Sequence, residues 1–367
     1  MDKIKILHGN VFDKIKELND NSIDCVVTSP PYWGLRDYGT GTWIGGDKNC
    51  PHKRLTKISK DTKTGHAGMF KKGNVVGDAI YKKYCPECGA KRKDEQLGLE
   101  ETYQEHIKNI VELFRAMKPK LKDSATIWLN YGDSYAATVN GTKVKDIKND
   151  DRGFVDKPFS TIQGSIKPKD LVMIPNRIAI ALQEDGWWIR SEIIWHKPNP
   201  MPESVKDRPT NCHEKIWFIT KNKKYYYDLD AIKEPCTEST KQRYKSGWKG
   251  NEERDYVNGK QNHFSKYIGT KKSKQDALKG RNKRNVWTVT TKPFKDAHFA
   301  TFPKDLIEPC IKAGCPEGGI VLDPFGGSGT TGIVAALNNR KSILIELNKD
   351  YIDIANKRIE KEVGLFI

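Results

Sequence analysis

The sequence predicts an α/β protein built on a mostly parallel sheet, and two observations support this. Short apolar runs alternate with amphipathic stretches near both ends of the chain, and the run at residues 23–27 is almost continuously apolar. Such runs are typical of strands buried on both faces of a parallel sheet. A glycine-rich turn at residues 324–331 follows another strand and precedes an apolar helix, which is typical of a nucleoside-binding site.

The regular parts of the chain contain seven expected strands, which lie near residues 4, 23, 125, 188, 215, 319 and 342. Apolar residues at helical spacing predict helices over residues 12–18, 103–117, 170–182, 304–313, 333–337 and 350–359. The first strand, helix and strand predict a right-handed crossover. This crossover would bring Ser29 to the carboxyl edge of the sheet, where open α/β sheets bind their ligands.

The charge of the chain indicates a polyanionic partner. Among 367 residues, 30% are charged, and the formal net charge is +17. A basic excess of this size favours nucleic acid over a membrane, with basicity that serves only solubility as the alternative. No run is long enough for a transmembrane helix, and residues 1–5 lack the apolar core of a signal peptide, so a cytoplasmic location is expected.

The cysteines predict a metal site. Eight cysteines at irregular spacing indicate reduced thiols or metal ligands rather than disulfides. The irregular insertion at residues 35–98 contains Cys-Pro-His and, later, Cys-Pro-Glu-Cys-Gly, so Cys50, His52, Cys85 and Cys88 could ligate a structural zinc ion. A reduced cysteine pair in a loop is the alternative. A redox pair is less favoured, because no thioredoxin-like strand precedes it.

A second irregular segment, residues 221–295, is rich in basic and aromatic residues. This composition suits phosphate contacts combined with stacking or groove contacts to DNA, and a solvated loop is the alternative. The densest basic cluster comprises Lys271, Lys272, Lys274, Lys279, Arg281, Lys283 and Arg284, and all of these except Lys279 form the candidate DNA-binding set.

The turn Ser29-Pro30-Pro31-Tyr32, directly after the apolar strand, is the candidate catalytic site. Its two adjacent prolines fix the backbone. The hydroxyl of Ser29 and the carbonyl of Pro30 could accept hydrogens from an exocyclic amine, while Tyr32 stacks on the heterocycle and Trp33 forms a second wall. A strand-to-loop turn with surface aromatics is the alternative.

The glycine-rich turn is the candidate cofactor site. Its glycines allow a close approach of the ligand, and Glu346, at the end of the next strand, is placed to bind ribose hydroxyls. No Gly-Lys-Ser/Thr follows the turn to hold phosphates, which favours S-adenosylmethionine over ATP or a dinucleotide. Asp323 or the loop amides could bind its amino-acid end, and a purely structural turn is the alternative. The candidate residues in this turn are Asp323, Phe325, Gly326, Gly327, Ser328, Gly329 and Thr330.

Taken together, these motifs resemble those of the amino-group DNA methyltransferases that act on N4 of cytosine or N6 of adenine. Thr28-Ser29-Pro30-Pro31-Tyr32-Trp33 is similar to that family's catalytic motif, and residues 323–330 are similar to its cofactor motif. The catalytic motif comes first, with a basic region between the two, which is the order of the β subgroup. The resemblance implies a circularly permuted, Rossmann-like methyltransferase fold with a seven-stranded sheet and central cofactor strands. It also implies that the target base flips out of the duplex.

The resemblance further implies cofactor contacts and a division of the chain. Asn10 corresponds to a contact near the adenine, where Asp is commoner, and Phe302 and Pro303 precede a helix beside the methionine portion. The expected parts are a catalytic part at residues 1–34 and 99–220, the insertion at 35–98, a target-recognition region at 221–295 and a cofactor-binding part at 296–367.

A serine before Pro-Pro resembles the N4-cytosine members more than the N6-adenine members. Site-specific methylation of cytosine N4 in double-stranded DNA is therefore the leading hypothesis, and N6-adenine methylation is the close alternative. Methylation of RNA or of a protein amide, and a catalytically inactive zinc-containing DNA-binding protein, are weaker alternatives. A restriction endonuclease partner would be a separate polypeptide, and the enzyme itself would be a monomer or a homodimer.

Overall fold

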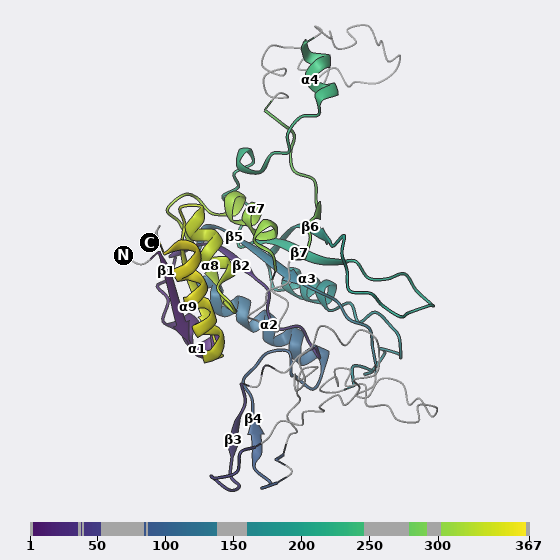
Figure 1. Cartoon of the computed structure of the whole chain (residues 1–367), viewed down its shortest axis with the longest axis vertical. Coiled ribbons are helices and arrows are strands. Elements are labelled where there is room, and N and C mark those ends of the chain that lie inside the picture. Colours follow the sequence, from purple (N-terminus) through teal and green to yellow (C-terminus); the bar gives the residue numbers. More distant parts are fainter. Residues whose placement is uncertain are drawn as a thin grey trace.

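The computed structural model describes residues 3–35, 38, 40–52, 84–85, 87–137, 160–245, 279–291 and 302–364. Over these residues the chain forms an eight-stranded sheet with helices on both faces, and a two-stranded ribbon projects from the body (Figure 1). The strand order is β1-β10-β9-β2-β5-β7-β6-β8. No helix within these ranges is long and apolar enough to cross a membrane.

The sheet is mostly parallel, as the sequence predicts. Only β7 runs against its neighbours, β5 and β6. The remaining pairings are parallel. The strands are β1 (Ile4–His8), β2 (Ile23–Thr28), β5 (Leu121–Tyr131), β6 (Trp188–His196), β7 (His213–Thr220), β8 (Val286–Thr288), β9 (Ile320–Asp323) and β10 (Lys341–Glu346).

The expected count of seven strands is too low by one. Strand β8 comes from the basic segment 221–295 and pairs in parallel with β6. It is 3 residues long, and only Trp287 among them is buried. A run this short in a polar segment shows no strand periodicity, so the sequence does not predict it. Its place in the sheet depends on the burial of one indole ring.

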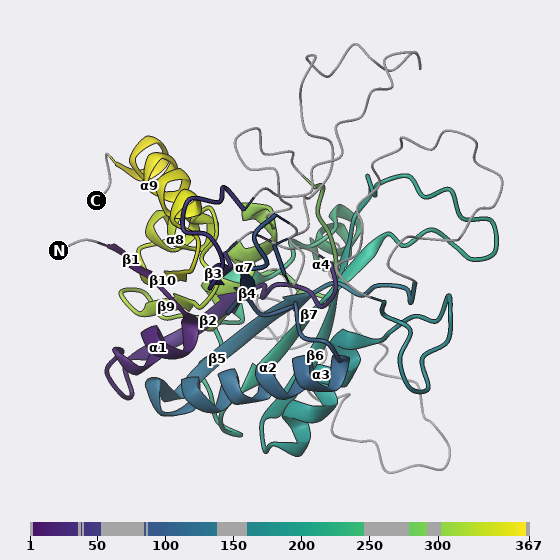
Figure 2. The ribbon, with the colours of Figure 1, turned by 90° about the horizontal axis from the view of Figure 1, so that it is seen from below.

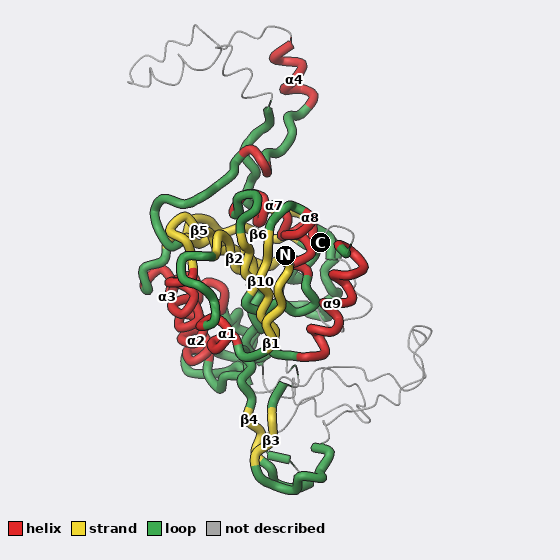
Figure 3. The backbone as a smooth tube through the Cα atoms, turned by 90° about the vertical axis from the view of Figure 1, so that its left-hand side faces the viewer, coloured by secondary structure: helices red, strands yellow, loops and turns green. Residues whose placement is uncertain are grey.

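The helices lie in two layers. Helices α1 (Val11–Lys16), α2 (Tyr103–Met117) and α3 (Ile174–Glu184) cover one face of the sheet. Helices α7 (Lys304–Gly314), α8 (Thr330–Leu337) and α9 (Lys349–Val363) cover the other (Figure 2; Figure 3). Alternate residues of β2 and β5 pack into the two separate cores on either side. The short helix α4 (Glu238–Lys245) lies apart from both layers (Figure 1).

The helix expected from Asp170 begins later, at Ile174. Met173 has a left-handed backbone, with φ of 62°, which an α-helix does not include. Leu171 instead forms an isolated β-bridge with Tyr135. Pro175 then occupies the first turn, where its missing N–H costs no hydrogen bond. Apolar spacing predicted the helix but not its start.

The insertion carries an antiparallel ribbon of β3 (Thr42–Ile44) and β4 (Lys91–Lys93). We call residues 40–52, 84–85 and 87–98 the arm. At the base of the arm, the N–H of Gly34 donates to the carbonyl oxygen of Gly98 at 2.9 Å. The arm therefore leaves the body directly after the Ser29–Tyr32 turn, and it points away from both helix layers (Figure 3).

Strand direction brings the candidate site residues to one edge of the sheet. Strands β1, β10, β9, β2 and β5 are mutually parallel, so their carboxyl ends meet there. Strand β7 is antiparallel to β5, so its first residues lie at the same edge. This is the edge at which open α/β sheets bind ligands. The candidate site residues at this edge lie in the first or last positions of a strand or just beyond its end. They are Asn10, Glu346, residues 323–330, Ser29, Asn130 and Glu214.

Candidate active site

The candidate catalytic turn and the candidate cofactor turn start from neighbouring strands. Strand β2 is buried along its whole length between β9 and β5. At its end, Thr28 Oγ1 donates a hydrogen bond to Asp323 Oδ1 at 2.7 Å. Ser29 follows Thr28, and the glycine-rich turn follows Asp323. One buried hydrogen bond therefore joins two motifs that are almost the whole chain apart.

The Ser29 hydroxyl begins a chain of hydrogen bonds. Ser29 Oγ donates to Tyr32 Oη at 3.2 Å, and Tyr32 Oη donates to Glu214 Oε2 at 2.8 Å. Asn130 Nδ2 donates to these two acceptors, Tyr32 and Glu214, at 2.7 and 2.9 Å. Lys197 pairs with the other oxygen of Glu214. Burial, and then the Glu214 charge, raise the pKa of Tyr32 well above its usual value, so its hydroxyl keeps the proton that it donates.

The ring of Tyr32 is held by its neighbours as well as by its hydroxyl. It stacks on Tyr131 with ring centroids 4.5 Å apart. Gly132 lies so close that a Cβ at this position would be 2.7 Å from the Tyr32 ring. The absence of a side chain at residue 132 therefore lets the ring lie against β5, in a fixed orientation that suits a stacking surface.

The prediction that Trp33 forms a second wall for the base is wrong. Trp33 is only 1% exposed and packs in the main core, where it meets the edge of Tyr103. Its Nε1 donates to the carbonyl of Glu100 at 2.9 Å. Its backbone N–H donates to Tyr131 Oη at 2.8 Å. The indole thus anchors the end of the turn, and its faces are covered by protein.

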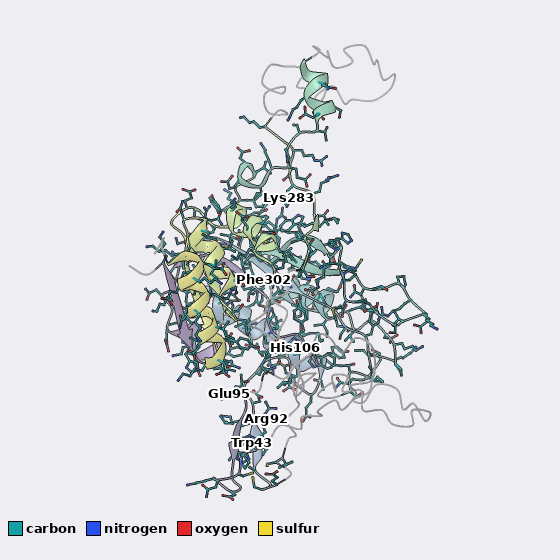
Figure 4. The ribbon with its side chains drawn as sticks, viewed as in Figure 1. Trp43, Arg92, Glu95, His106, Lys283 and Phe302 are labelled. Carbon is teal, nitrogen blue, oxygen red and sulfur yellow. The ribbon has the colours of Figure 1, made fainter. Side chains whose placement is uncertain are left out.

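A buried polar network supports this anchor. His106, which is labelled in Figure 4, lies with Nδ1 2.8 Å from Glu100 Oε2 and with Nε2 2.7 Å from Tyr131 Oη. Glu100 also accepts the N–H of Gly98, at the base of the arm. These contacts join helix α2, strand β5 and the arm behind the catalytic turn, which holds Tyr131 where Tyr32 stacks on it.

The glycine-rich turn requires glycine at two positions. The N–H of Gly326 donates to the carbonyl of Ile345 at 2.8 Å, and a Cβ on Gly326 would lie 2.8 Å from Leu344 Cβ. Gly329 has φ of 80° and is the N-cap residue of α8. The first glycine lets the turn lie against β10, and the second allows the left-handed residue before the helix.

Asp323 holds the turn from behind. Its side chain is 1% exposed, and its Oδ1 accepts the N–H of Phe325 at 3.1 Å in addition to the Thr28 hydroxyl. Its Oδ2 accepts the Thr331 hydroxyl at 2.6 Å. The prediction that Asp323 itself binds the amino-acid end of the cofactor is therefore wrong in this structure, because the carboxyl is enclosed by its own loop.

Asp323 predicts a pH dependence of stability. Burial raises its pKa to about 7 from 3.8. Between these values the folded protein binds a proton that the unfolded chain has lost, so stability falls as pH rises through this window. The contribution is about 1.4 kcal/mol per pH unit. We expect urea unfolding of the wild type and Asp323→Asn to show a stability difference that changes between about pH 4 and 7. A difference independent of pH would contradict this assignment.

Glu346 is the carboxylate that faces the turn at its open side. It ends β10, and its two oxygens accept the N–H groups of Gly327 and Asn348, each at 2.8 Å. Unlike Asp323, Glu346 is not fully buried. Burial raises its pKa. A carboxylate has about four lone-pair directions, so those that the backbone leaves can accept ligand hydroxyls.

The remaining residues of the turn are fastened to α9. Arg358 Nη1 donates to Ser328 Oγ at 2.8 Å and to Thr330 Oγ1 at 3.0 Å. Ser328 and Thr330 are buried. Phe325 is partly buried against the main core. These three side chains position the loop, and the N–H groups of Phe325, Gly326 and Gly327 already donate within the protein.

The three predicted contacts outside the turn also have structural partners. Asn10 caps α1, because its Oδ1 accepts the N–H of Phe12 at 2.8 Å, while its Nδ2 donates to Glu95 on the arm at 3.2 Å. Pro303 is buried and precedes α7. Phe302, labelled in Figure 4, is half-buried against the core beneath that helix.

The predicted DNA-binding cluster is only partly described, because Lys271, Lys272 and Lys274 lie outside the described residues. Arg281 and Arg284 both contact Glu234, at 2.8 and 3.4 Å. Lys283, labelled in Figure 4, lies over the Trp287 ring at 5.1 Å. The predicted zinc ligands Cys50, His52, Cys85 and Cys88 do come together, with all four donor atoms within 4.8 Å of one another.

Glu214, Asn130 and Lys197 are the site residues that sequence reasoning missed. Each lies at an end of β7, β5 or β6, and all three ends share the edge that carries Ser29. A charged or amide residue at the end of a buried strand is the signal that could have pointed to them. This signal can be used only when the strand order is known, because the sequence alone does not place β7 beside β5.

Comparison with known proteins gives one family. The sequence model of the family described as DNA methylase matches residues 23–357. The Type II methyltransferase M.Cfr9I of Citrobacter freundii is 37% identical over 357 residues, which cover 97% of this chain and 88% of the relative. The Type II methyltransferase M.SmaI of Serratia marcescens is 37% identical over 355 residues, with 97% and 90% covered.

Two solved structures share the fold. The PvuII DNA methyltransferase, named as cytosine-N4-specific, has a TM-score of 0.52 at 15% identity and covers 100% of this chain and 93% of its own. The DNA modification methylase TTHA0409 of Thermus thermophilus, in complex with S-adenosyl-L-methionine, has a TM-score of 0.50 at 19% identity, with 98% and 95% covered. At these identities the likeness concerns the fold.

Proposed function

Since the chain belongs to the DNA methylase family, and is thus an S-adenosylmethionine-dependent DNA amino-methyltransferase, we propose that its target is the N4 amine of a flipped cytosine in double-stranded DNA. The hydrogen bond from Thr28 to Asp323 supports methyl transfer at this site, because it joins the Ser29-Pro30-Pro31-Tyr32 turn to the glycine-rich turn. The serine before Pro-Pro is what favours cytosine over adenine. The order of these turns in the chain, with β9 and β10 lying between β1 and β2, also supports a circularly permuted sheet.

The residues of the glycine-rich turn fit S-adenosylmethionine. Glu346 is a partly exposed carboxylate beside the turn, which suits ribose hydroxyls, and the glycines of the turn allow a close approach of the ligand. The turn contains no lysine, which suits a ligand without phosphate. We propose that Glu346 and residues 326–329 hold this cofactor. When bound, it supplies an electrophilic methyl group on a sulfonium.

The catalytic turn orients the amine. The hydrogen of the Ser29 hydroxyl is donated to Tyr32, so the lone pairs of Ser29 Oγ are left to accept an N–H of the cytosine amine. The carbonyl of Pro30 accepts the second N–H. Two acceptors bias the nitrogen towards a tetrahedral geometry, which directs its lone pair at the methyl group. In an in-line displacement the N–C bond would form as the S–C bond breaks, with the neutral thioether as leaving group and one amine proton released to water. Positioning would supply most of the rate.

Glu214 strengthens this acceptor. A serine oxygen is a weaker acceptor than a carboxylate, but here it donates to Tyr32, which donates to Glu214. Hydrogen bonds in such chains polarise one another, so the negative charge of Glu214 raises the electron density on Ser29 Oγ. We propose that Glu214 is a positioning residue that acts through the Tyr32 hydroxyl. Lys197, paired with its second oxygen, holds it in place.

A double-mutant cycle tests the role of Glu214. We expect Glu214→Gln to lower the single-turnover methylation rate about tenfold to a hundredfold, because a hydrogen bond to a charged group contributes about 1.5–3 kcal/mol. If Glu214 acts through Tyr32, adding Glu214→Gln to Tyr32→Phe causes no further loss. Glu192→Gln is the matched control, since Glu192 pairs with Lys215 across the same two strands at 2.6 Å. Losses that multiply in the double variant would contradict the relay.

The proposed function is tested by sequencing DNA from cells that express the protein, with a method that reports methylated bases. The expected result is N4-methylcytosine at one short recognition sequence, in keeping with Type II methyltransferase relatives. Methylated adenine at that sequence would replace cytosine as the target. If the purified protein methylates RNA and no DNA, the basic residues of 221–295 serve a different nucleic acid from the one proposed.

A further inference from the structure

Four potential metal ligands lie at the tip of the arm, away from the candidate active site. Cys50 and His52 follow β3, and Cys85 and Cys88 precede β4. Their donor atoms all lie within 4.8 Å of one another. Residues 53–83 separate the two pairs of ligands in the sequence. One ion bound by all four ligands would therefore link the two pairs.

Two of the separations between donor atoms match those of a tetrahedral zinc site. With Zn–S near about 2.3 Å and Zn–N near about 2.0–2.1 Å, tetrahedral geometry separates two sulfurs by about 3.8 Å and a sulfur and nitrogen by about 3.6 Å. Cys50 Sγ and Cys85 Sγ are 3.7 Å apart, and Cys88 Sγ and His52 Nδ1 are 3.5 Å apart. A disulfide would need about 2.05 Å between its sulfurs.

The backbone around the cluster is shaped for these ligands. A Cβ on Gly46 would lie 2.8 Å from the Cys88 sulfur, and Gly46 has φ of 71°. Glycine at 46 therefore makes room for the ligand.

The imidazole is oriented as well. The ring of Trp43 stacks on His52, with centroids 4.7 Å apart and an interplanar angle of 15° (Figure 4 labels Trp43 in the arm). In the Cys85–Cys88 turn, the N–H of Gly89 donates to the carbonyl of Cys85 at 2.9 Å. Both contacts fix ligand direction before any ion binds, which lowers the ordering cost of binding.

The arm has little else to hold its tip. Its two strands are three residues long each, and a two-stranded hairpin alone is marginal in water. Ile44 is 57% exposed and Tyr84 is 55% exposed, so neither supplies a core at the tip. Small units without a core commonly gain stability from a structural metal.

We propose that Cys50, His52, Cys85 and Cys88 bind one structural Zn²⁺ per chain, which closes the tip of the arm. The site has four protein ligands and no open position, so it is structural rather than catalytic. The base of the arm contacts the body behind the catalytic turn, where a Cβ on Gly98 would lie 3.0 Å from the carbonyl oxygen of Tyr32. The proposal does not rest on the methylation chemistry.

Metal analysis of the full chain, purified without a histidine tag, tests the site. We expect about one zinc per chain, and Co²⁺ in its place should give the visible d–d bands and the thiolate charge-transfer band of a tetrahedral Cys₃His site. Cys85→Ser and Cys88→Ser should lose the metal, whereas Cys212→Ser, which lies outside the cluster, should keep it.

A second readout separates metal loss from misfolding. Chelation of wild-type protein should remove the zinc and expose the arm to protease, and added Zn²⁺ should reverse this while S-adenosylmethionine binding stays unchanged. A wild-type chain that contains no zinc and gives no thiolate band with Co²⁺ would overturn the proposal. So would a Cys88→Ser variant with an unchanged Co²⁺ spectrum.

Discussion

Replacing Tyr32 with alanine should reduce methyl transfer to DNA about a thousandfold. The substitution removes the ring on which the base stacks, worth about 1–3 kcal/mol, and the hydroxyl that joins Ser29 to Glu214, worth about 1.5–3 kcal/mol. Together these losses raise the barrier by about 4 kcal/mol, and each 1.4 kcal/mol is about tenfold in rate. Single-turnover transfer of a labelled methyl group to duplex DNA measures the effect.

Tyr32→Phe is the matched control for this substitution. It keeps the ring, and with it the stacking on Tyr131, so we expect a loss of only about tenfold to a hundredfold. Both variants should bind S-adenosylmethionine as the wild type does, which shows that the fold is intact. Methylation by Tyr32→Ala within tenfold of wild type would remove this residue from the site.

Replacing Gly326 with alanine should weaken S-adenosylmethionine binding by at least about tenfold, which is about 1.4 kcal/mol. The new Cβ would lie 2.8 Å from Leu344 Cβ, which has no freedom to move aside. The turn must therefore shift from β10, which stretches the Gly326–Ile345 hydrogen bond and moves Gly327 away from Glu346. Isothermal titration calorimetry gives the dissociation constant.

Gly318→Ala is the control for the backbone cost of losing a glycine. Gly318 has φ of 74°, and a Cβ there meets nothing within 4 Å. It lies before β9 rather than in the turn, so the variant should lose about 1 kcal/mol of stability and keep its affinity for the cofactor. If wild type and Gly326→Ala bind S-adenosylmethionine with equal affinity, the close approach of this turn to β10 is not required for binding.

The main elements of the fold could be predicted from local patterns. The apolar run before Ser29 and the strand before the glycine-rich turn are both buried strands, β2 and β9, and they are neighbours in the sheet. Buried parallel strands carry a strong apolar signal, and their shared direction places their ends together. This explains why the two motifs could be paired without knowledge of the contacts.

The roles of single side chains could not be predicted in the same way. Trp33 and Asp323 lie within the recognised motifs, yet one is buried in the core and the other is enclosed by its own loop. A motif fixes residue type and spacing but not which way a side chain points. Glu214 lies outside both motifs, and only the antiparallel pairing of β7 with β5 brings it to Tyr32.

Mass spectrometry of nucleosides from duplex DNA, methylated in vitro by the purified protein and by Ser29→Ala, tests the central claim most directly. We expect N4-methylcytosine with the wild type and its loss with Ser29→Ala, because that hydroxyl accepts an N–H of the amine. N6-methyladenine alone would contradict the assignment of the base. Undiminished methylation by Ser29→Ala would contradict the assignment of the site.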